Sequence, residues 1–388
     1  MEGLTTYTLG ELSINGKGSY GIGAPSVDFS ENKYIYLRIT DINDDGTLSS
    51  SDRKSVDDPD AHKYVLQKND IVFARTGNST GRAYFYDERD GELVYAGFLI
   101  KFSLDPAKVN PKILKYYTHS KPYYDWVKSF DTGATRGNIN AQTFASMPIE
   151  LPDRETQDRI VDILSAIDNK IRLNNRINHN LEEQAQALFD SFVASDNGFG
   201  YHQLSEIAAI NPSRTLSKNT VARCIDMSFL STSGTFPSGW EYKPYSGGMR
   251  FQNGDTIMAR ITPCLENGKA GYINFLDSNE TAFGSTEYIV LSAKEGYPSE
   301  MFYFLTRNAD FIDYAVKNMN GSSGRQRVSG ETIGKYSLPV LTGKQLSDLK
   351  THCSEVMKTI CNNCLENRLL VSTRDSLLPK LMSGEITC

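Results

Sequence analysis

The sequence lacks the marks of a membrane or secreted protein. None of its apolar runs approaches the roughly 20 residues that a helix needs to cross a bilayer. Its first residues, MEGLTTYTLGELS, have neither a basic start nor an apolar stretch, and so do not predict a signal peptide. Only six cysteines occur in 388 residues, which fits a reducing compartment. We therefore expect a cytoplasmic protein.

Few residues stand in spacings typical of a metal site or an active site. Cys361 and Cys364 form a C-x-x-C pair, but no second pair accompanies them, so buried helix cysteines are favoured over a zinc site. The five histidines are dispersed. The segment NGKGSYGIG departs from a phosphate-binding loop, because glycine follows Lys17 where serine or threonine is needed. The Asn/Asp-Pro-Pro-aromatic signature of an amino-methyltransferase is also absent. We predict no catalytic residues, no metal site and no cofactor bound by this chain.

Excess positive charge is missing too. The net charge is −6 and the isoelectric point is near 5.5. This balance argues against a chain that coats DNA through a broad basic surface. It leaves room for a local basic face, because the total does not say where the charges lie.

The sequence does contain a long internal repeat. NDIVFARTGNSTGRAYF in the first half matches GDTIMARITPCLENGKAGYI in the second, with Asp70 and Asp255 185 positions apart. Three further blocks match in the same order: YLRITDI with ARCIDM, NPKILKYYTHS with YPSEMFYFLTR, and GATRGNI with SSGRQRV. The offset grows by two residues at a time, as small loop insertions would cause. A repeat of this length indicates two domains of one fold.

Each half follows one plan. Short β-branched and aromatic runs, broken by Gly, Asn and Asp, predict strands. A helical piece, a polar glycine loop and a short run ending in Leu-Pro follow. A long helical pattern closes each half. The sequence therefore predicts an α+β fold with α/β domains at 1–152 and 196–340, and helical regions at 153–195 and 341–388.

The two long helices carry narrow apolar stripes. The first is expected from about Asp153 to Phe192, and the second from Gly343, with Pro379 starting a separate short helix. Near-heptad spacing predicts coiled-coil pairing, with Asn174 and Gln184 as polar positions that set the register. The residues expected to pair are Ile160, Ile163, Ile167, Ile177, Leu181, Leu346, Leu349, Val356 and Ile360.

Because the repeat supplies an internal partner, the two helices can cover each other. An antiparallel coiled coil would hold the two domains at opposite ends with a pseudo-two-fold relation. About 35 helical residues span roughly 50 Å, which exceeds the roughly 34 Å of one DNA turn. The open alternative is a coiled coil that dimerises two chains.

Two polar loops recur in both halves. They are RTGNSTGR with RITPCLENGK, and GATRGNIN with GSSGRQRV. Arginine can read guanine, asparagine or glutamine can read adenine, and Lys, Ser and Thr suit phosphates. Such loops are also common as solvated turns, but repeated positions with different sequences favour one scaffold that reads two targets. The candidate DNA-binding residues are Arg75, Thr76, Asn78, Ser79, Arg82, Arg136, Asn138, Asn140, Arg260, Thr262, Lys269, Arg325, Gln326 and Arg327.

Over essentially its whole length the chain resembles the specificity (S) subunits of type I restriction-modification systems. The stretch from LPDRETQDRIVDILSAIDNKI to QALFDSF is similar to the central conserved region of that family, and RDSLLPKLMSGEI to its C-terminal region. NDIVFAR and GDTIMAR resemble blocks of its target recognition domains. The second helix departs from the family pattern in its early turns, where GKQLSDLKTHCSEVMKT lacks the usual Glu-Gln start.

The resemblance implies a non-catalytic subunit of a DNA adenine methyltransferase and restriction endonuclease complex. Each target recognition domain would read one half of a bipartite double-stranded DNA sequence. The helices would set the unread spacer and dock two modification (methyltransferase) subunits, which restriction/translocase subunits would join. S-adenosylmethionine, Mg and ATP are expected on those partners. The alternatives are a stand-alone DNA-binding regulator that dimerises through its coiled coil, and a self-contained nuclease or methyltransferase.

Overall fold

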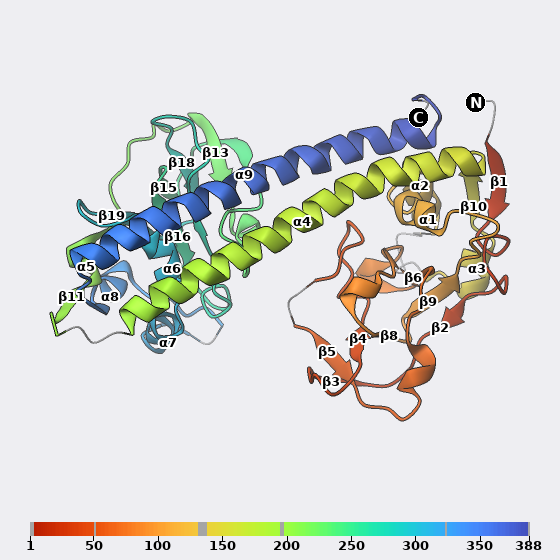
Figure 1. Cartoon of the computed structure of the whole chain (residues 1–388), viewed down its shortest axis with the longest axis horizontal. Helices are drawn as coiled ribbons and strands as arrows, with labels where there is room; N and C mark the ends of the chain where they lie inside the picture. The colour runs from red at the N-terminus through yellow and green to blue at the C-terminus, as the bar shows by residue number, and fades with distance from the viewer. Residues whose placement is uncertain (1–3, 50–51, 131–137, 195–197, 323, 387–388) are drawn as a thin grey trace. The chain divides into compact units, whose positions relative to one another are not determined.

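The computed structural model describes residues 4–49, 52–130, 138–194, 198–322 and 324–386. The chain forms two compact units, Met1–Asn169 with Val371–Cys388, and Lys170–Leu370. Each unit holds one mixed α/β domain and part of each of two long helices, α4 and α9 (Figure 1). The helical regions are therefore not separate bodies: each long helix begins in one unit and ends in the other.

The first unit contains two four-stranded sheets, ordered β2-β9-β6-β7 and β3-β5-β4-β8, and the pair β1-β10. Its strands are β1 (Thr5–Thr8), β2 (Ser19–Tyr20), β3 (Ser26–Asp28), β4 (Ile35–Leu37), β5 (Lys54–Val56), β6 (Asp70–Ala74), β7 (Ala83–Phe85), β8 (Leu93–Tyr95), β9 (Leu99–Ser103) and β10 (Pro148–Leu151). Its short helices are α1 (Pro111–Tyr117), α2 (Lys121–Lys128) and α3 (Ala141–Ala145). Strand β6 is buried at all five positions and forms the centre of its sheet.

The second unit also contains two four-stranded sheets, ordered β12-β19-β16-β17 and β14-β13-β18-β15, and the pair β11-β20. Its strands are β11 (Tyr201–Gln203), β12 (Ala208–Ile210), β13 (Val221–Ile225), β14 (Glu241–Pro244), β15 (Met249–Phe251), β16 (Asp255–Ala259), β17 (Ala270–Tyr272), β18 (Ala282–Gly284), β19 (Tyr288–Ala293) and β20 (Ser337–Pro339). Its short helices are α5 (Leu204–Ile207), α6 (Met301–Leu305), α7 (Ala309–Lys317) and α8 (Gly330–Gly334).

The internal repeat holds in three dimensions. The sheet β2-β9-β6-β7 has the strand order of β12-β19-β16-β17, and all its pairs are antiparallel in both units. The parallel pair β4-β8 likewise corresponds to β13-β18. The second sheets then diverge, because β5 pairs with β4 whereas β15 pairs with β18. Each domain thus combines a repeated sheet with a sheet that differs.

A buried aspartate fixes the start of the central strand in both domains. Asp70 accepts a hydrogen bond from the Gln67 backbone N–H at 2.8 Å and lies 3.1 Å from Lys101 Nζ. Asp255 accepts one from the Gln252 backbone N–H at 2.8 Å and pairs with Arg214 Nη2 at 2.8 Å. The repeat therefore preserves a turn that orients β6 and β16. The cation paired with the aspartate differs, because it is Lys101 in the first domain and Arg214 in the second.

Helix α4 (Arg154–Val193) fills the predicted helical region. Asp153 caps its first turn, with Oδ1 accepting from the Thr156 backbone N–H at 3.0 Å. In the first unit Ile160, Val161 and Leu164 pack into the domain core. In the second unit Ala185 and Phe189 do the same. A helix with one apolar stripe is thus anchored in a core near each end.

Helix α9 (Gly343–Met382) starts where expected but does not break at Pro379. Thr342 and Gln345 form a reciprocal capping box, with Thr342 N donating to Gln345 Oε1 at 2.9 Å. The expected separate C-terminal helix was wrong. Pro379 lies in the last turn with its ring exposed, where it removes a single helical hydrogen bond, while neighbouring Leu378 and Leu381 are buried in the core of the first unit.

Within the second unit α4 and α9 run antiparallel. Asn174 Nδ2 donates to Asn367 Oδ1 at 2.9 Å and to Glu366 Oε2 at 2.7 Å. One turn along α4, Asn363 Nδ2 donates to Asn178 Oδ1 at 2.7 Å. Both Asn174 and Asn178 are buried, so amides rather than leucines form this stretch of the helix interface. Buried amides specify register at some cost in stability.

The pairing face differs from the predicted one at several positions. Ile163 is 39% exposed and Ile177 is 38% exposed, so both lie on the helix surface rather than in the pair. Gln184 is also exposed, whereas Asn174 is buried as expected for a register-setting residue. The other expected residues are buried or half-buried: Ile160, Ile167, Leu181, Leu346, Leu349, Val356 and Ile360.

A charged network holds the same two helices in the first unit. Asp168 Oδ1 accepts from Arg374 Nη1 at 3.1 Å, and its Oδ2 accepts from Lys115 Nζ of α1 and from the Tyr116 hydroxyl. Burial would raise the pKa of Asp168, but the charges and hydrogen bonds of Lys115 and Arg374 outweigh it. The pKa of Asp168 therefore lies below its ordinary value. No helix within the described ranges is long and apolar enough to span a membrane.

Candidate nucleic-acid interface

In the first domain the described end of the second polar loop, residues 138–140, lies beside the first loop. Thr76 and Asn138 form an antiparallel β-bridge, and the Ile139 backbone N–H donates to the Arg75 carbonyl at 3.0 Å. The first loop leaves the buried strand β6, which fixes its base. The second loop leads into α3, whose first turn is capped by Asn140. Segments some 60 residues apart in sequence thus form one rim.

The second domain builds the same rim with matching bonds. Ile261 and Arg327 form the equivalent bridge, and the Val328 backbone N–H donates to the Arg260 carbonyl at 3.0 Å. Thr262 N also donates to the Gln326 carbonyl at 3.1 Å. Ser329 caps α8 as Asn140 caps α3. The backbone frame is therefore shared, while the side chains on it differ.

In the first domain the rim is aromatic around one arginine. The Arg75 guanidinium lies over the Tyr20 ring, 5.1 Å from its centroid. Arg75 Nε is buried and has no hydrogen-bond partner within the described ranges. Phe98 accepts a backbone bond from Arg75 N at 3.1 Å and exposes 59% of its surface. The Arg75 guanidinium can donate hydrogen bonds to a base. The exposed aromatic surface beside it can stack on a base.

In the second domain the rim is ionic. Arg327 donates to the Glu287 carboxylate from Nε at 2.9 Å and from Nη2 at 2.7 Å. Arg260 Nε lies 3.7 Å from the same carboxylate. The hydrogen bond from Arg327 holds the pKa of Glu287 below its ordinary value, and the pKa of Arg327 is raised in return. Glu287 and Arg327 are therefore both charged at neutral pH.

Arg82 and Lys269, which end the first loop of each domain, take up equivalent contacts inside the fold. Arg82 Nη1 donates to the Ile42 carbonyl at 3.1 Å, and Lys269 Nζ donates to the Met227 carbonyl at 3.1 Å. Arg82 also pairs with the exposed Asp44 at 2.7 Å. Both cations therefore tie the loop to the neighbouring segment, which competes with a role on phosphate.

The remaining candidates differ in exposure. Asn78, Asn138, Asn140 and Arg325 are exposed, Thr76, Thr262 and Gln326 are half-buried, and Ser79 is buried. Arg136 lies outside the described residues. Tyr20, Phe98 and Glu287 were not among the candidates, because they stand outside the matched polar loops. The strand register places Phe98, before β9, and Glu287, before β19, next to the arginine of each Ala-Arg pair.

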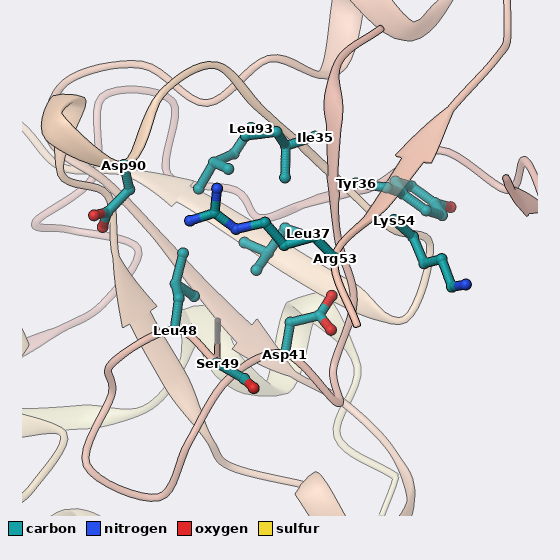
Figure 2. A pocket seen from close by; sticks show the side chains of 10 residues that line it. All are labelled: Ile35, Tyr36, Leu37, Asp41, Leu48, Ser49, Arg53, Lys54, Asp90 and Leu93. Atoms are coloured by element: carbon teal, nitrogen blue, oxygen red, sulfur yellow. The ribbon is translucent and has the colours of Figure 1, made fainter. Parts of the chain in front are cut away.

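Two hollows in the described part of the first domain are lined by residues outside these loops. One hollow in the first domain, of about 30 Å³, has the Arg53 side chain extending across it toward the side of Asp90 (Figure 2). That volume holds about one water molecule. A wider groove of about 660 Å³ is lined by Glu31, Asp57, Asp58 and Glu92. Its acidic lining repels phosphates, so neither hollow extends the rim as a nucleic-acid surface.

Catalytic and metal-binding groupings are not assembled in the part of the chain that the structure describes. No cluster of three or more His, Cys, Asp or Glu side chains suits a metal ion there. Gly77–Gly81 has the G-x-S-x-G spacing of a hydrolase nucleophile, but it lies on a short 3-10 turn rather than between a strand and a long helix. Ser79 is buried, and within the same ranges its hydroxyl bonds neither histidine nor carboxylate.

Comparison with known proteins agrees with this architecture. Residues 1–183 match the family described as the type I restriction modification DNA specificity domain. The HindI specificity subunit of Haemophilus influenzae is 22% identical, with 98% of this chain and 99% of that protein covered. The EcoAI specificity subunit of Escherichia coli is 30% identical over 34% of this chain and 23% of its own. An S subunit structure from M. genitalium superimposes with a TM-score of 0.57 at 16% identity, covering 98% and 96% of the two chains.

Fold and rims together define a tandem-domain protein whose repeated α/β domains are joined by long paired helices. The comparisons specify the class further. Residues 1–183 match the type I restriction modification DNA specificity domain, and over nearly its whole length the chain is similar to a type I specificity subunit.

Proposed function

We propose that each domain reads one half of a bipartite double-stranded DNA sequence through its two-loop rim. The observation that carries this proposal is the rim built twice on one backbone frame with different side chains. Tyr20, Arg75 and Phe98 line it in the first domain, and Arg260, Glu287 and Arg327 in the second. A shared frame with changed side chains is what reading two different half-sites requires.

The helices set the spacer and dock two methyltransferase subunits in this proposal. Exposed leucines and an isoleucine on the helix pair of the second unit support the docking role. Leu173 and Ile177 lie one turn apart on α4, and Leu365 and Leu369 one turn apart on α9. The bonds of Asn174 to Asn367 and of Asn363 to Asn178 put these pairs at matching levels. Apolar surface of this kind marks interaction sites.

The chemistry belongs to the partners in the same proposal. Methyltransferase subunits would supply S-adenosylmethionine and methylate adenine, and restriction/translocase subunits would use ATP and Mg. This chain then acts as a non-catalytic addressing subunit in the cytoplasm. A methyltransferase gene beside the gene for this chain would support the assignment. Cofactor-dependent turnover by the purified chain alone would contradict it.

The runner-up function is a stand-alone regulator that dimerises through its coiled coil. Internal pairing weighs against it, because α4 already uses α9 of the same chain as its partner. A chain that forms stable homodimers through both helices, and does not bind a modification subunit, would favour the regulator.

Replacement of one exposed arginine tests the reading of half-sites. Arg325→Ala should weaken binding at the second half-site only, by about 1–3 kcal/mol if the guanidinium contacts guanine with two hydrogen bonds. Arg136→Ala should act in the same way on the first half-site. Methylation profiling of DNA from cells carrying the chain defines the target, and binding titrations with either half altered measure the effect. Lys317→Ala, which removes an exposed cation paired with Asp313, is the control. Equal losses at both half-sites would refute separate reading.

A further inference from the structure

One position differs sharply between the two rims, which share a backbone frame. Strand register aligns Ala74 with Leu99 in the first domain and Ala259 with Tyr288 in the second. Phe98 and Glu287, the residues just before those strands, therefore correspond. The backbone bonds agree, since Arg75 N donates to the Phe98 carbonyl at 3.1 Å and Arg260 N to the Glu287 carbonyl at 3.0 Å.

The residue facing this position changes with it. Asn138 and Arg327 form the equivalent β-bridges to the first loop, with Thr76 and Ile261. The first domain thus has an exposed phenylalanine and an exposed amide at these two positions. In the second domain the Glu287 carboxylate accepts hydrogen bonds from two nitrogens of the Arg327 guanidinium. The two positions have changed together, from apolar and neutral to a bonded ion pair.

Each of the three side-chain nitrogens of Arg327 takes part in this arrangement. Its Nε and Nη2 bind Glu287, and its Nη1 donates to the Arg325 carbonyl at 3.2 Å. The Glu287 carboxylate can still accept further hydrogen bonds. A carboxylate has about four acceptor sites, Arg327 occupies part of them, and 26% of the Glu287 side chain remains exposed.

A carboxylate on a DNA-facing rim is repelled by phosphates unless it is neutralised and bonded. Arg327 and Arg260 supply the neutralisation, at 2.7 Å and 3.7 Å. The donor that a carboxylate recognises on a base edge is an exocyclic amino group. Phenylalanine at the equivalent position offers apolar contact instead, which suits the thymine methyl group.

We propose that Glu287 is a specificity-determining residue that accepts a hydrogen bond from the exocyclic amino group of a cytosine or adenine in the second half-site. This inference rests on the proposed reading of half-sites. Arg327 is then a positioning residue that orients the Glu287 carboxylate and offsets its charge. Phe98 takes the same place in the first domain and favours a thymine.

Selection from DNA with both half-sites randomised tests the inference, using the full-length chain assembled with its modification subunits. Glu287→Gln should lower the preference for the amino-bearing base at one position of the second half by roughly tenfold. Glu287→Phe should shift that position toward thymine. Arg327→Lys keeps the charge and should leave the base identity unchanged. Glu295→Gln, which removes a charge beyond the other end of β19, is the matched control.

Retention of the first half-site and of the other positions of the second half-site in every variant shows that both domains are folded. An unchanged second half in Glu287→Gln and Glu287→Phe, with a bipartite wild-type site, overturns the inference and leaves the proposed function standing. The same base change in Arg327→Lys as in Glu287→Gln also overturns it, because Glu287 would then act only through Arg327. A wild-type complex that selects no two-part sequence overturns both.

Discussion

Single residues divide into those that both domains share and those that differ. Asp70 and Asp255 are shared: each is buried, begins the central strand and accepts a backbone bond from the turn before it. Arg82 and Lys269 are shared as well, since both bind a carbonyl of the neighbouring segment. Such residues hold the frame, whereas Phe98 and Glu287 vary on top of it. A substitution at a shared residue should therefore damage folding, whereas a substitution at Phe98 or Glu287 should change selectivity.

Asp255→Asn should destabilise the second domain by about 3 kcal/mol or more, because it removes one partner of a buried ion pair with Arg214. Differential scanning calorimetry should show the transition of that domain shifted down while the other stays. Asp277→Asn is the control, since Asp277 pairs with Arg223 but is 83% exposed, and exposed pairs contribute about 0–1 kcal/mol. Equal shifts for both variants would show that burial of Asp255 is not decisive.

The repeated sequence blocks mark Asp70 and Asp255, but they do not mark Glu287. The matched Ala-Arg blocks place Arg75 and Arg260 on the rim without any structure, because the repeat marks them. Glu287 belongs to no matched polar loop, and it reaches Arg260 only because β19 pairs with β16. Long-range strand register is not readable from a single sequence.

At the scale of elements, the two long helices do more than pair with each other. Their existence and their starts follow from a sustained stripe in each, and their antiparallel order from the repeat, but the end of α9 does not follow, because that helix continues through Pro379. The sequence does not predict which side chains of each helix are buried. The apolar stripe can pack against a domain core or against the partner helix, and a single sequence does not distinguish the two. Ile163 and Ile177 are left outside, while Asn174 and Asn178 occupy the interface.

The network around Asp168 should make helix pairing sensitive to acid. The pKa of Asp168 is lower in the folded chain than its ordinary 3.8, so its stabilisation is present above that value and is lost as pH falls through the folded pKa. Asp168→Asn should lower stability by about 2–3 kcal/mol near neutral pH, and the difference should vanish well below pH 3.8. Thermal unfolding across pH measures this. Asp162→Asn, at an exposed position on the same helix, should have little effect, and a deficit that persists in acid would contradict the ion-pair explanation.

Exposed leucines on the helix pair should matter for assembly rather than folding. Leu369→Asp should weaken binding of the methyltransferase subunit by at least about tenfold, since a buried leucine contributes about 1.5–3 kcal/mol. Co-purification and titration of the two subunits measure the loss, and circular dichroism checks that the helices remain. Ser372→Asp adds the same charge at another exposed site of α9. Full assembly of the Leu369 variant would place the docking surface elsewhere.

At the scale of the whole molecule, both long helices are continuous where the chain passes from one compact unit to the other. That passage falls at Asn169–Lys170 in α4 and at Leu370–Val371 in α9. A change in length at these two points leaves each domain and its own helix contacts intact. It therefore isolates the spacing function that we propose for the helices.

Insertion of one heptad at both points should change the spacer between the half-sites. Seven helical residues add about 10 Å, which corresponds to about three base pairs at roughly 3.4 Å each. Because three base pairs also rotate the duplex by about a third of a turn, the expected result is a longer spacer or loss of binding, with both half-site sequences unchanged. Methylation profiling reads spacer and half-sites together. A heptad inserted only in α4 cannot keep both the Asp168–Arg374 pair of the first unit and the Asn174–Asn367 pair of the second, and should abolish binding. An unchanged spacer after the matched insertion would refute the helices as the element that sets it.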